Sequence, residues 1–315
     1  MSENYTKKPL LVSGLQRSGT TWTAKMIALS PEMFYVLEPF NFLREPIHLF
    51  GAGTNFPFFP EVDEELFLKM RSGLGLSLSG QELKIYMKQS SSPKYHLYHL
   101  VRYFTLNHRL KKHMRPVIQD PFAIFMAPWL GRRLDIRMLF LFRHPAAYIN
   151  SMKRMKWGFN FDWLARQEAL MEEVLADFRD EILKWAPQEF IPFSIETQAL
   201  VWNIFTTVML RYRDGHKDWL FYRHEDLSRK PIESFKKIYR EIGLVYDDSI
   251  IRQIEKFTGA QNRTAAKEGK MHTLRRNSLE NIKIWQSQLS TGEIDTIRHL
   301  TSPVCDKLYS DEDWN

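Results

Sequence analysis

The residues from Gly14 to Trp22 combine two glycines, an arginine and three hydroxyl side chains in one short segment. The segment follows a short apolar run and precedes residues with helical spacing, which predicts a strand, a glycine turn and the start of a helix. Gly14 and Gly19 have the spacing of a P-loop, but Thr20 stands where the P-loop lysine belongs, and Arg17 lies inside the loop. Backbone N–H groups of such a turn bind phosphate at the positive end of the helix dipole. The segment therefore predicts a site for a nucleotide phosphate ester, without the lysine that reaches the γ-phosphate of ATP.

A second candidate anion site follows the apolar run 138–142. Arg143 comes directly after this run, and Ser151 lies about two helical turns further along. Arginine offers a planar fork of donors and serine adds one more, so the two side chains can face one phosphate. An arginine in this position is often only a surface ion pair. Together with the first segment, however, the pair indicates a nucleotide with phosphates at two separate positions.

Strands and helices alternate along the sequence. Helical patterns cover 145–156, 162–185, 195–212 and 231–242, and the last of them stops at Gly243, a natural end for a helix. Such alternation predicts a three-layer α/β fold, a P-loop-like central parallel sheet flanked by helices, with the ligand at the carboxyl ends of the strands. The five apolar segments that we expect to form this sheet are Leu10–Val12, Phe34–Leu37, Val117–Ile118, Met138–Phe142 and Trp219–Tyr222.

Composition limits the classes of protein that this chain can belong to. With 315 residues and 44% hydrophobic residues, the chain can bury a large core, and we expect one domain over 1–315. The net charge of +7 suits a polyanionic ligand. The sequence has no long block of lysine and arginine, so we do not expect nucleic acid as a partner. Cys305 is the only cysteine, which excludes a disulfide within the chain and a cysteine-based metal site. Because no signal-peptide pattern or membrane-length apolar run is present, we expect a soluble cytoplasmic protein without an integral membrane segment.

The two anion motifs resemble those of the sulfotransferase family that uses 3′-phosphoadenosine 5′-phosphosulfate (PAPS). Arg17–Trp22 is similar to the 5′-phosphosulfate loop of that family, and Arg143 with Ser151 is similar to its 3′-phosphate pair, at the family spacing. The cytosolic branch has a lysine in the first loop. Because this chain has Arg17 there, it resembles the carbohydrate, tyrosylprotein and bacterial branches instead.

Two later segments extend the resemblance. His224–Leu227 is similar to the Tyr-Glu-Asp-Leu segment of the family, and Arg276–Ser278 with Trp285 is similar to the terminal motif of bacterial and tyrosylprotein-type members. The resemblance implies PAPS as co-substrate and a reaction that needs no metal. It does not choose between Arg275 and Arg276 as the side chain that closes over the 3′-phosphate. The nucleotide contacts that it implies are Arg17, Ser18, Gly19, Thr20, Thr21, Trp22, Arg143, Ser151, His224, Arg275 and Arg276.

The reacting groups are expected at two other strand ends. Glu38 ends the second apolar segment, 21 residues after Arg17, where the tyrosylprotein branch has its glutamate base. We therefore predict that Glu38 takes the proton of the acceptor, although a capping role is the alternative. Gln119 occupies the position of a lysine that contacts the leaving group in family members, so it can donate a hydrogen bond but brings no charge. Asp120 is a second acid or base candidate, and a turn role before proline is the stronger interpretation of it.

The acceptor is defined only loosely by the sequence. An aromatic loop at 44–60 and a helical insert near 157–215 are expected on the acceptor side, although both can equally be packing elements. A basic loop at 260–276 is a candidate lid. By family analogy the acceptor is a small molecule or glycan, first a carbohydrate or glycolipid hydroxyl, then a small phenol, sterol or lipid alcohol. A P-loop kinase and a non-catalytic nucleotide-binding protein remain as alternatives.

Overall fold

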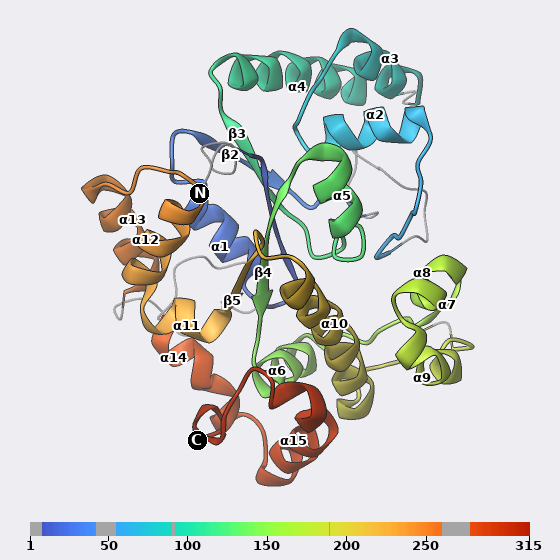
Figure 1. Cartoon of the computed structure of the whole chain (residues 1–315), viewed down its shortest axis with the longest axis vertical. Helices are drawn as coiled ribbons and strands as arrows, with labels where there is room; N and C mark the ends of the chain where they lie inside the picture. Colours follow the sequence, from blue (N-terminus) through green and yellow to red (C-terminus); the bar gives the residue numbers. More distant parts are fainter. Residues whose placement is uncertain (1–7, 42–54, 90–91, 189, 260–277) are drawn as a thin grey trace.

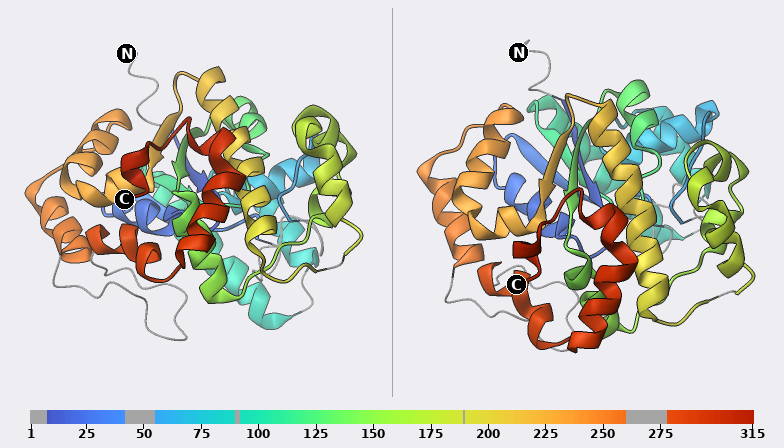
Figure 2. Two further views of the ribbon diagram at one scale, coloured as in Figure 1. Left: turned by 90° about the horizontal axis from the view of Figure 1, so that it is seen from below. Right: turned by 60° about the horizontal axis from the view of Figure 1, so that its bottom comes forward.

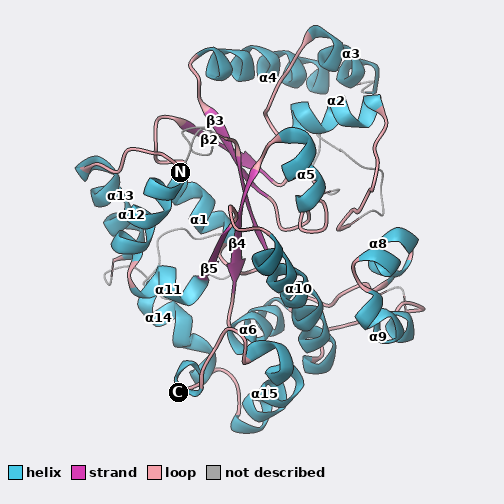
Figure 3. Ribbon diagram, viewed as in Figure 1, coloured by secondary structure: helices cyan, strands magenta, loops and turns pink. Residues whose placement is uncertain are grey.

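The computed structural model describes the chain except for residues 1–7, 42–54, 90–91, 189 and 260–277. Its centre is a five-stranded sheet in which all neighbouring strands are parallel, in the order β2-β3-β1-β4-β5 (Figures 1 and 3). The five predicted strands are confirmed, each within a few residues of its expected bounds. They are β1 (Leu10–Gly14), β2 (Met33–Leu37), β3 (Arg115–Gln119), β4 (Arg137–Phe142) and β5 (Leu220–Arg223).

The inner strands are mostly apolar because both of their faces are covered. Every residue of β1, β3 and β4 is buried. Leu10 and Val12 of β1 pack on one side of the sheet, whereas Leu11 packs on the other, as the alternation of side chains along a strand requires. The sheet therefore separates two hydrophobic cores, and this confirms the expected three-layer α/β arrangement.

Helices cover both faces of the sheet (Figure 3). One face is covered by α1 (Thr20–Ile27), α12 (Pro231–Glu241) and α13 (Asp248–Thr258). The other face is covered by α5 (Ala127–Leu134), α6 (Pro145–Met155) and α10 (Ile195–Gly215), and α15 (Thr291–Cys305) packs along α10 and α6 (Figure 2). Parallel strands need a crossover connection between them, and helices on the two faces of the sheet provide these connections.

Further helices surround this core. The helices α2 (Glu64–Gly73), α3 (Gly80–Gln89) and α4 (Pro93–Lys111) form a group between β2 and β3 in sequence, at the top of Figure 1. The helices α11 (His224–Arg229) and α14 (Ser278–Lys283) flank the lower end of the sheet in that view. Among the described residues, no helix combines the length and the apolar character needed to cross a bilayer.

The helical pattern predicted over 162–185 is wrong as one helix. The segment breaks into α7 (Asp162–Ala165), α8 (Glu168–Glu173), a 3₁₀ turn and α9 (Arg179–Trp185). Gln167 leaves the helical conformation at φ −101° and ψ 85°, and its side-chain amide donates to the Phe56 carbonyl and accepts from the Phe58 N–H. This tertiary contact outweighs the local preference for helix. The predicted stop after 231–242 is confirmed, because Gly243 has a left-handed backbone with φ 68°.

Gly14 is a position where only glycine fits, and its substitution tests the central strand pair. Its φ is 146°, and a Cβ atom would lie 2.5 Å from the Leu141 carbonyl oxygen on β4. We expect Gly14→Ala to lower the free energy of unfolding by about 1–3 kcal/mol, measured by urea denaturation. Gly292→Ala is the matched control, since nothing lies within 4 Å of a Cβ there. Equal stability of the two variants would contradict this account of the β1–β4 pairing.

Candidate functional site

Most of the described site residues that the sequence predicted lie at one edge of the sheet, because five parallel strands end there. Gly14 ends β1 and Gln119 ends β3, and Gln119 is paired in register with Val12 of β1. Arg143 directly follows β4, and His224 directly follows β5. Since parallel strands present all their carboxyl ends together, side chains more than 200 residues apart in sequence become neighbours.

The turn after β1 has the shape expected of a phosphate-binding loop. Gly19 caps α1 with a left-handed backbone, φ 88°, and the Ser18 N–H donates to the Leu15 carbonyl at 3.1 Å. A Cβ atom at Gly19 would lie 2.5 Å from Nδ1 of His224, so the His224 ring packs directly against the turn. No acidic residue lies in the first turn of α1. The first N–H groups and the dipole of α1 therefore favour an anion at this edge.

Arg17 connects the two predicted anion sites. Its Nε donates to the Ser151 hydroxyl on α6 at 3.0 Å, and its main-chain carbonyl accepts a hydrogen bond from the Arg143 guanidinium. The Arg17 guanidinium also lies 5.7 Å from the centre of the Trp157 ring. The Arg143 carbonyl in turn accepts from the Trp202 indole at 2.9 Å. Ser151 thus contacts Arg17, and the three predicted residues form one cationic cluster in which Arg17 joins the turn after β1 to α6.

Gln119 occupies the centre of a second polar group. Its side-chain nitrogen donates to the Thr20 hydroxyl at 3.2 Å and to a Glu38 carboxylate oxygen at 3.4 Å. Its side-chain oxygen accepts from the Tyr35 hydroxyl at 3.0 Å, which fixes the orientation of the amide. The second Glu38 oxygen accepts from the Asn41 amide at 2.9 Å. Gln119 therefore joins the phosphate-binding turn to the candidate base.

Glu38 and Arg17 share an unusual backbone conformation. Both are non-glycine residues in the left-handed region, with φ 44° for Glu38 and 67° for Arg17. The Glu38 N–H is held by the Gln119 carbonyl at 2.8 Å. Such conformations cost free energy and collect at functional sites, where the surrounding structure enforces them. Arg17 and Glu38, the two residues with the most direct predicted roles, are among the six described non-glycine residues in this region.

A cavity of about 360 Å³ opens beside Glu38. It lies between β2 and the helical group of α2 and α4, and its wall combines apolar side chains with the charged side chains of Glu38, Arg102 and Arg109. Among the described residues that line it, none comes from the insert 157–215 or from 55–60. The lining residues are Phe34, Tyr35, Val36, Leu37, Glu38, Pro39, Gly73, Gly75, Tyr98, Val101, Arg102, Thr105, Leu106 and Arg109.

The aromatic residues expected near the acceptor pack into the core instead. The Phe56 ring lies 5.9 Å from Phe159 and 4.8 Å from Phe205, and Phe161 is fully buried. Trp157, in contact with Arg17, is the member of this group that borders the site. The packing interpretation therefore holds for most of the aromatic residues in 55–60 and 157–163.

Asp120 has the structural role that the sequence favoured. Its two carboxylate oxygens accept from the backbone N–H groups of Phe40 at 2.6 Å and Phe122 at 2.9 Å. Complete burial raises its pKa well above the ordinary value of an aspartate. A carboxylate enclosed in this way shapes the turn after β3 and does not face the cavity.

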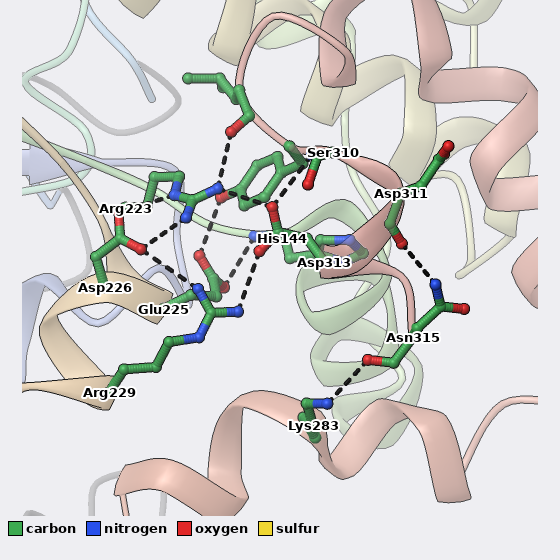
Figure 4. A network of polar contacts seen from close by, with 12 residues as sticks. His144, Arg223, Glu225, Asp226, Arg229, Lys283, Ser310, Asp311, Asp313 and Asn315 are labelled. Carbon is green, nitrogen blue, oxygen red and sulfur yellow. Dashed lines mark hydrogen bonds and ion pairs between the residues drawn. The ribbon is translucent and has the colours of Figure 1, made fainter.

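A buried network holds the start of α6 against the C-terminal segment (Figure 4). Glu225 accepts from the His144 N–H at 3.1 Å and from the Tyr309 hydroxyl at 3.0 Å. Beside it, Arg223 bonds Asp226 and Asp313. Because His144 directly follows Arg143, this network fixes the backbone that carries the predicted phosphate ligand.

Several other predicted residues lie behind or outside the site. Trp22 and His224 meet edge to face with ring centres 5.7 Å apart, and His224 is buried, so both support the turn from behind. Trp285 is buried and stacks on His144 with ring centres 5.0 Å apart, which is a packing role. Arg275 and Arg276 lie outside the described residues, as does the predicted lid at 260–276.

Sequence reasoning missed two residues of the site, Tyr35 and Asn41, and it expected Trp157 at the acceptor rather than beside Arg17. A signal existed for Tyr35, because it places a hydroxyl group in an otherwise apolar strand three residues before Glu38. Asn41 and Trp157 act through contacts with Glu38 and Arg17 that only the folded chain brings about. Within the described part of the chain, no group of three or more His, Cys, Asp or Glu side chains is arranged to hold a metal ion.

Comparison with known proteins gives one partial sequence match and several distant structural ones. No family model matches the sequence. The chain is 30% identical over 90 residues to carbohydrate sulfotransferase 1 of Danio rerio, an alignment that covers 29% of this chain and 21% of that protein. A mouse sulfotransferase complexed with PAP aligns with a TM-score of 0.46 at 14% identity, covering 98% of this chain and 86% of that one. The sulfotransferase domain of the Synechococcus PCC 7002 olefin synthase aligns with a TM-score of 0.45 at 16% identity, covering 97% and 96%.

The structural role of Asp120 can be tested by removing one of its two acceptors. Asp120→Asn places an amide NH₂ opposite a backbone N–H group, so we expect the free energy of unfolding to fall by about 1–3 kcal/mol in urea denaturation. Asp214→Asn is the control, because Asp214 has a largely exposed side chain. Unchanged stability of Asp120→Asn would show that the turn does not depend on both oxygens.

Proposed function

We propose that this chain is a sulfotransferase that moves the sulfuryl group of PAPS to a hydroxyl group of an acceptor. One set of contacts carries the proposal: the cluster of Arg17, Arg143 and Ser151 beside a glycine turn that lacks the P-loop lysine. This arrangement suits a nucleotide with two separate phosphate groups better than it suits ATP. The 90-residue similarity to a carbohydrate sulfotransferase supports the same reaction class.

The proposed binding mode follows from the positions of the cations. The 5′-phosphosulfate would lie on the turn, against the N–H groups at the start of α1 and the side chains of Arg17, Ser18, Thr20 and Thr21. The 3′-phosphate would lie at Arg143 and Ser151, with His224 and Trp22 behind the turn. Arg275 and Arg276 remain sequence candidates for closing over this phosphate.

In the proposed reaction, the acceptor oxygen attacks the sulfur atom in line with the leaving phosphate. The bond between sulfur and the 5′-phosphate oxygen breaks, the electron pair leaves with PAP, and the acceptor proton goes to Glu38. The amide of Gln119 lies between Thr20 and Glu38 and would donate to the transferring group or the leaving oxygen. Because Gln119 carries no charge, Arg17 would supply the positive charge that stabilises the leaving phosphate.

For the acceptor, a carbohydrate or glycolipid hydroxyl is the first proposal, and the Danio rerio similarity supports it. The apolar side chains in the wall of the cavity beside Glu38 suit an acceptor of this class that carries an apolar group, and they keep a lipid alcohol as the second candidate. We also propose a cytoplasmic location, which suits the single cysteine, Cys305, a buried free thiol.

Nucleotide affinity tests the cationic cluster. We expect Arg17→Ala and Arg143→Ala each to weaken PAP binding by about 1.5–3 kcal/mol, since each removes a charge-assisted contact. Isothermal titration calorimetry with EDTA present measures this effect, and ATP serves as the competing ligand. Arg154→Ala is the matched control, because Arg154 is an exposed arginine on the same helix as Ser151. Tighter binding of ATP than of PAP, or unchanged affinity in both cluster variants, would exclude the proposed site.

The base is tested by Glu38→Gln, which keeps the shape of the side chain but cannot accept the proton. We expect normal PAPS affinity and a turnover lower by about 10² to 10⁴-fold. Glu61→Gln, an exposed glutamate substitution, is the control. If Glu38→Gln also lost PAPS affinity, Glu38 would have a structural role, and if it kept full turnover, another group would be the base. The reaction is followed by the mass gain of a hydroxyl acceptor.

A further inference from the structure

The helix α4 turns an apolar stripe toward solvent. Leu97, Val101 and Phe104 are 64%, 57% and 69% exposed. At 3.6 residues per turn these three positions share one face, while His99 and Leu106 on the opposite face are buried. Figure 1 shows α4 at the upper edge of the molecule, beside α3 and α2. A contiguous apolar surface of this kind marks a contact with a partner or a membrane.

The charges of α4 restrict what that partner can be. The helix has no aspartate or glutamate between Pro93 and Lys111. Lys94 lies beyond one end of the apolar stripe, and Lys111 with Lys112 lies beyond the other end, all of them exposed. Two copies of this helix placed face to face would bring cations against cations. An anionic surface would instead attract both ends of the stripe.

The stripe continues into the cavity beside the candidate base. Tyr98, Val101, Thr105 and Arg109 of α4 line that cavity, and Glu38 lies at its other side. Val101 therefore belongs both to the exposed stripe and to the wall of the cavity. A molecule whose apolar part rests on α4 can place a polar head toward Glu38 without leaving the surface of the protein.

We propose that α4 docks on an anionic lipid surface and that the acceptor is an amphiphile taken from that surface. The apolar stripe enters the boundary between head groups and acyl chains, and the flanking lysines contact the anionic head groups. The hydroxyl-bearing head of the acceptor then lies in the cavity near Glu38. The docking stands on α4 alone, whereas the acceptor class rests on the proposed sulfuryl transfer.

Vesicle sedimentation of the full chain tests the docking. We expect binding to phosphatidylcholine vesicles that contain phosphatidylglycerol, weaker binding to phosphatidylcholine alone, and loss of binding as salt is added. The double variant Leu97→Ser/Phe104→Ser should weaken binding about tenfold or more, because it removes two large apolar side chains that would otherwise transfer from water into the lipid. Lys94→Glu/Lys111→Glu should abolish the preference for anionic vesicles and is a second, independent variant. Leu183→Ser/Val245→Ser is the control, since both residues are exposed on other parts of the surface.

The outcomes separate this inference from the proposed function. Absence of vesicle binding, or binding that survives both α4 variants, would overturn the docking. A wild-type dimer in light scattering that the serine variant dissociates would identify the stripe as an interface between copies and would also overturn it. PAP affinity, measured by calorimetry on the same proteins, should stay unchanged in every α4 variant. Vesicle binding without any PAP binding would leave the docking in place and remove the sulfotransferase proposal.

Discussion

The position of the Arg17 main chain is the constraint on which the cationic site depends. Its carbonyl accepts from the Arg143 guanidinium, and its side chain donates to Ser151, so the turn after β1 and the helix after β4 are joined at one residue. The parallel pairing of β1 with β4, in which Gly14 is opposite Leu141, sets the distance that these contacts span. A left-handed backbone at Arg17 directs the carbonyl and the side chain to the two partners. The two halves of the anion site therefore cannot shift independently of the sheet.

Gln119 links this rigid half of the site to Glu38. The Tyr35 hydroxyl donates to its amide oxygen, so the amide nitrogen must face Thr20 and Glu38. A lysine at this position would bring a positive charge within reach of the Glu38 carboxylate. A glutamine brings only a dipole, and the positive charge of the site is then concentrated at Arg17 and Arg143. A glutamine at this position therefore leaves the link between the turn and Glu38 intact.

Much of this arrangement could be predicted because parallel sheets bring strand ends together. Buried apolar runs gave the five strands, and the polar residues that follow them gave the site residues Glu38, Gln119 and Arg143. Arg17 was expected in the site, but its contact with Ser151 could not be predicted, since it joins residues 134 positions apart in sequence. The break in the helix at Gln167 could not be predicted for a similar reason. The Gln167 amide forms hydrogen bonds with the backbone of Phe56 and Phe58, and helical periodicity carries no information on such a contact.

The two halves of the site differ in where they sit on the sheet. The predicted phosphate ligands follow β1 and β4, which are inner strands covered on both faces. Glu38 follows β2, an edge strand, and its cavity is completed by the peripheral helices α2 and α4. Apolar spacing identifies inner strands well, but it cannot tell which peripheral helix lies beside an edge strand. The sequence therefore placed the acceptor near 44–60 and 157–215, and the described aromatic side chains of these segments mostly fill the core. In this fold the strand pairing itself fixes the predicted nucleotide contacts, whereas the cavity beside Glu38 depends on helices that pack at the edge of the sheet.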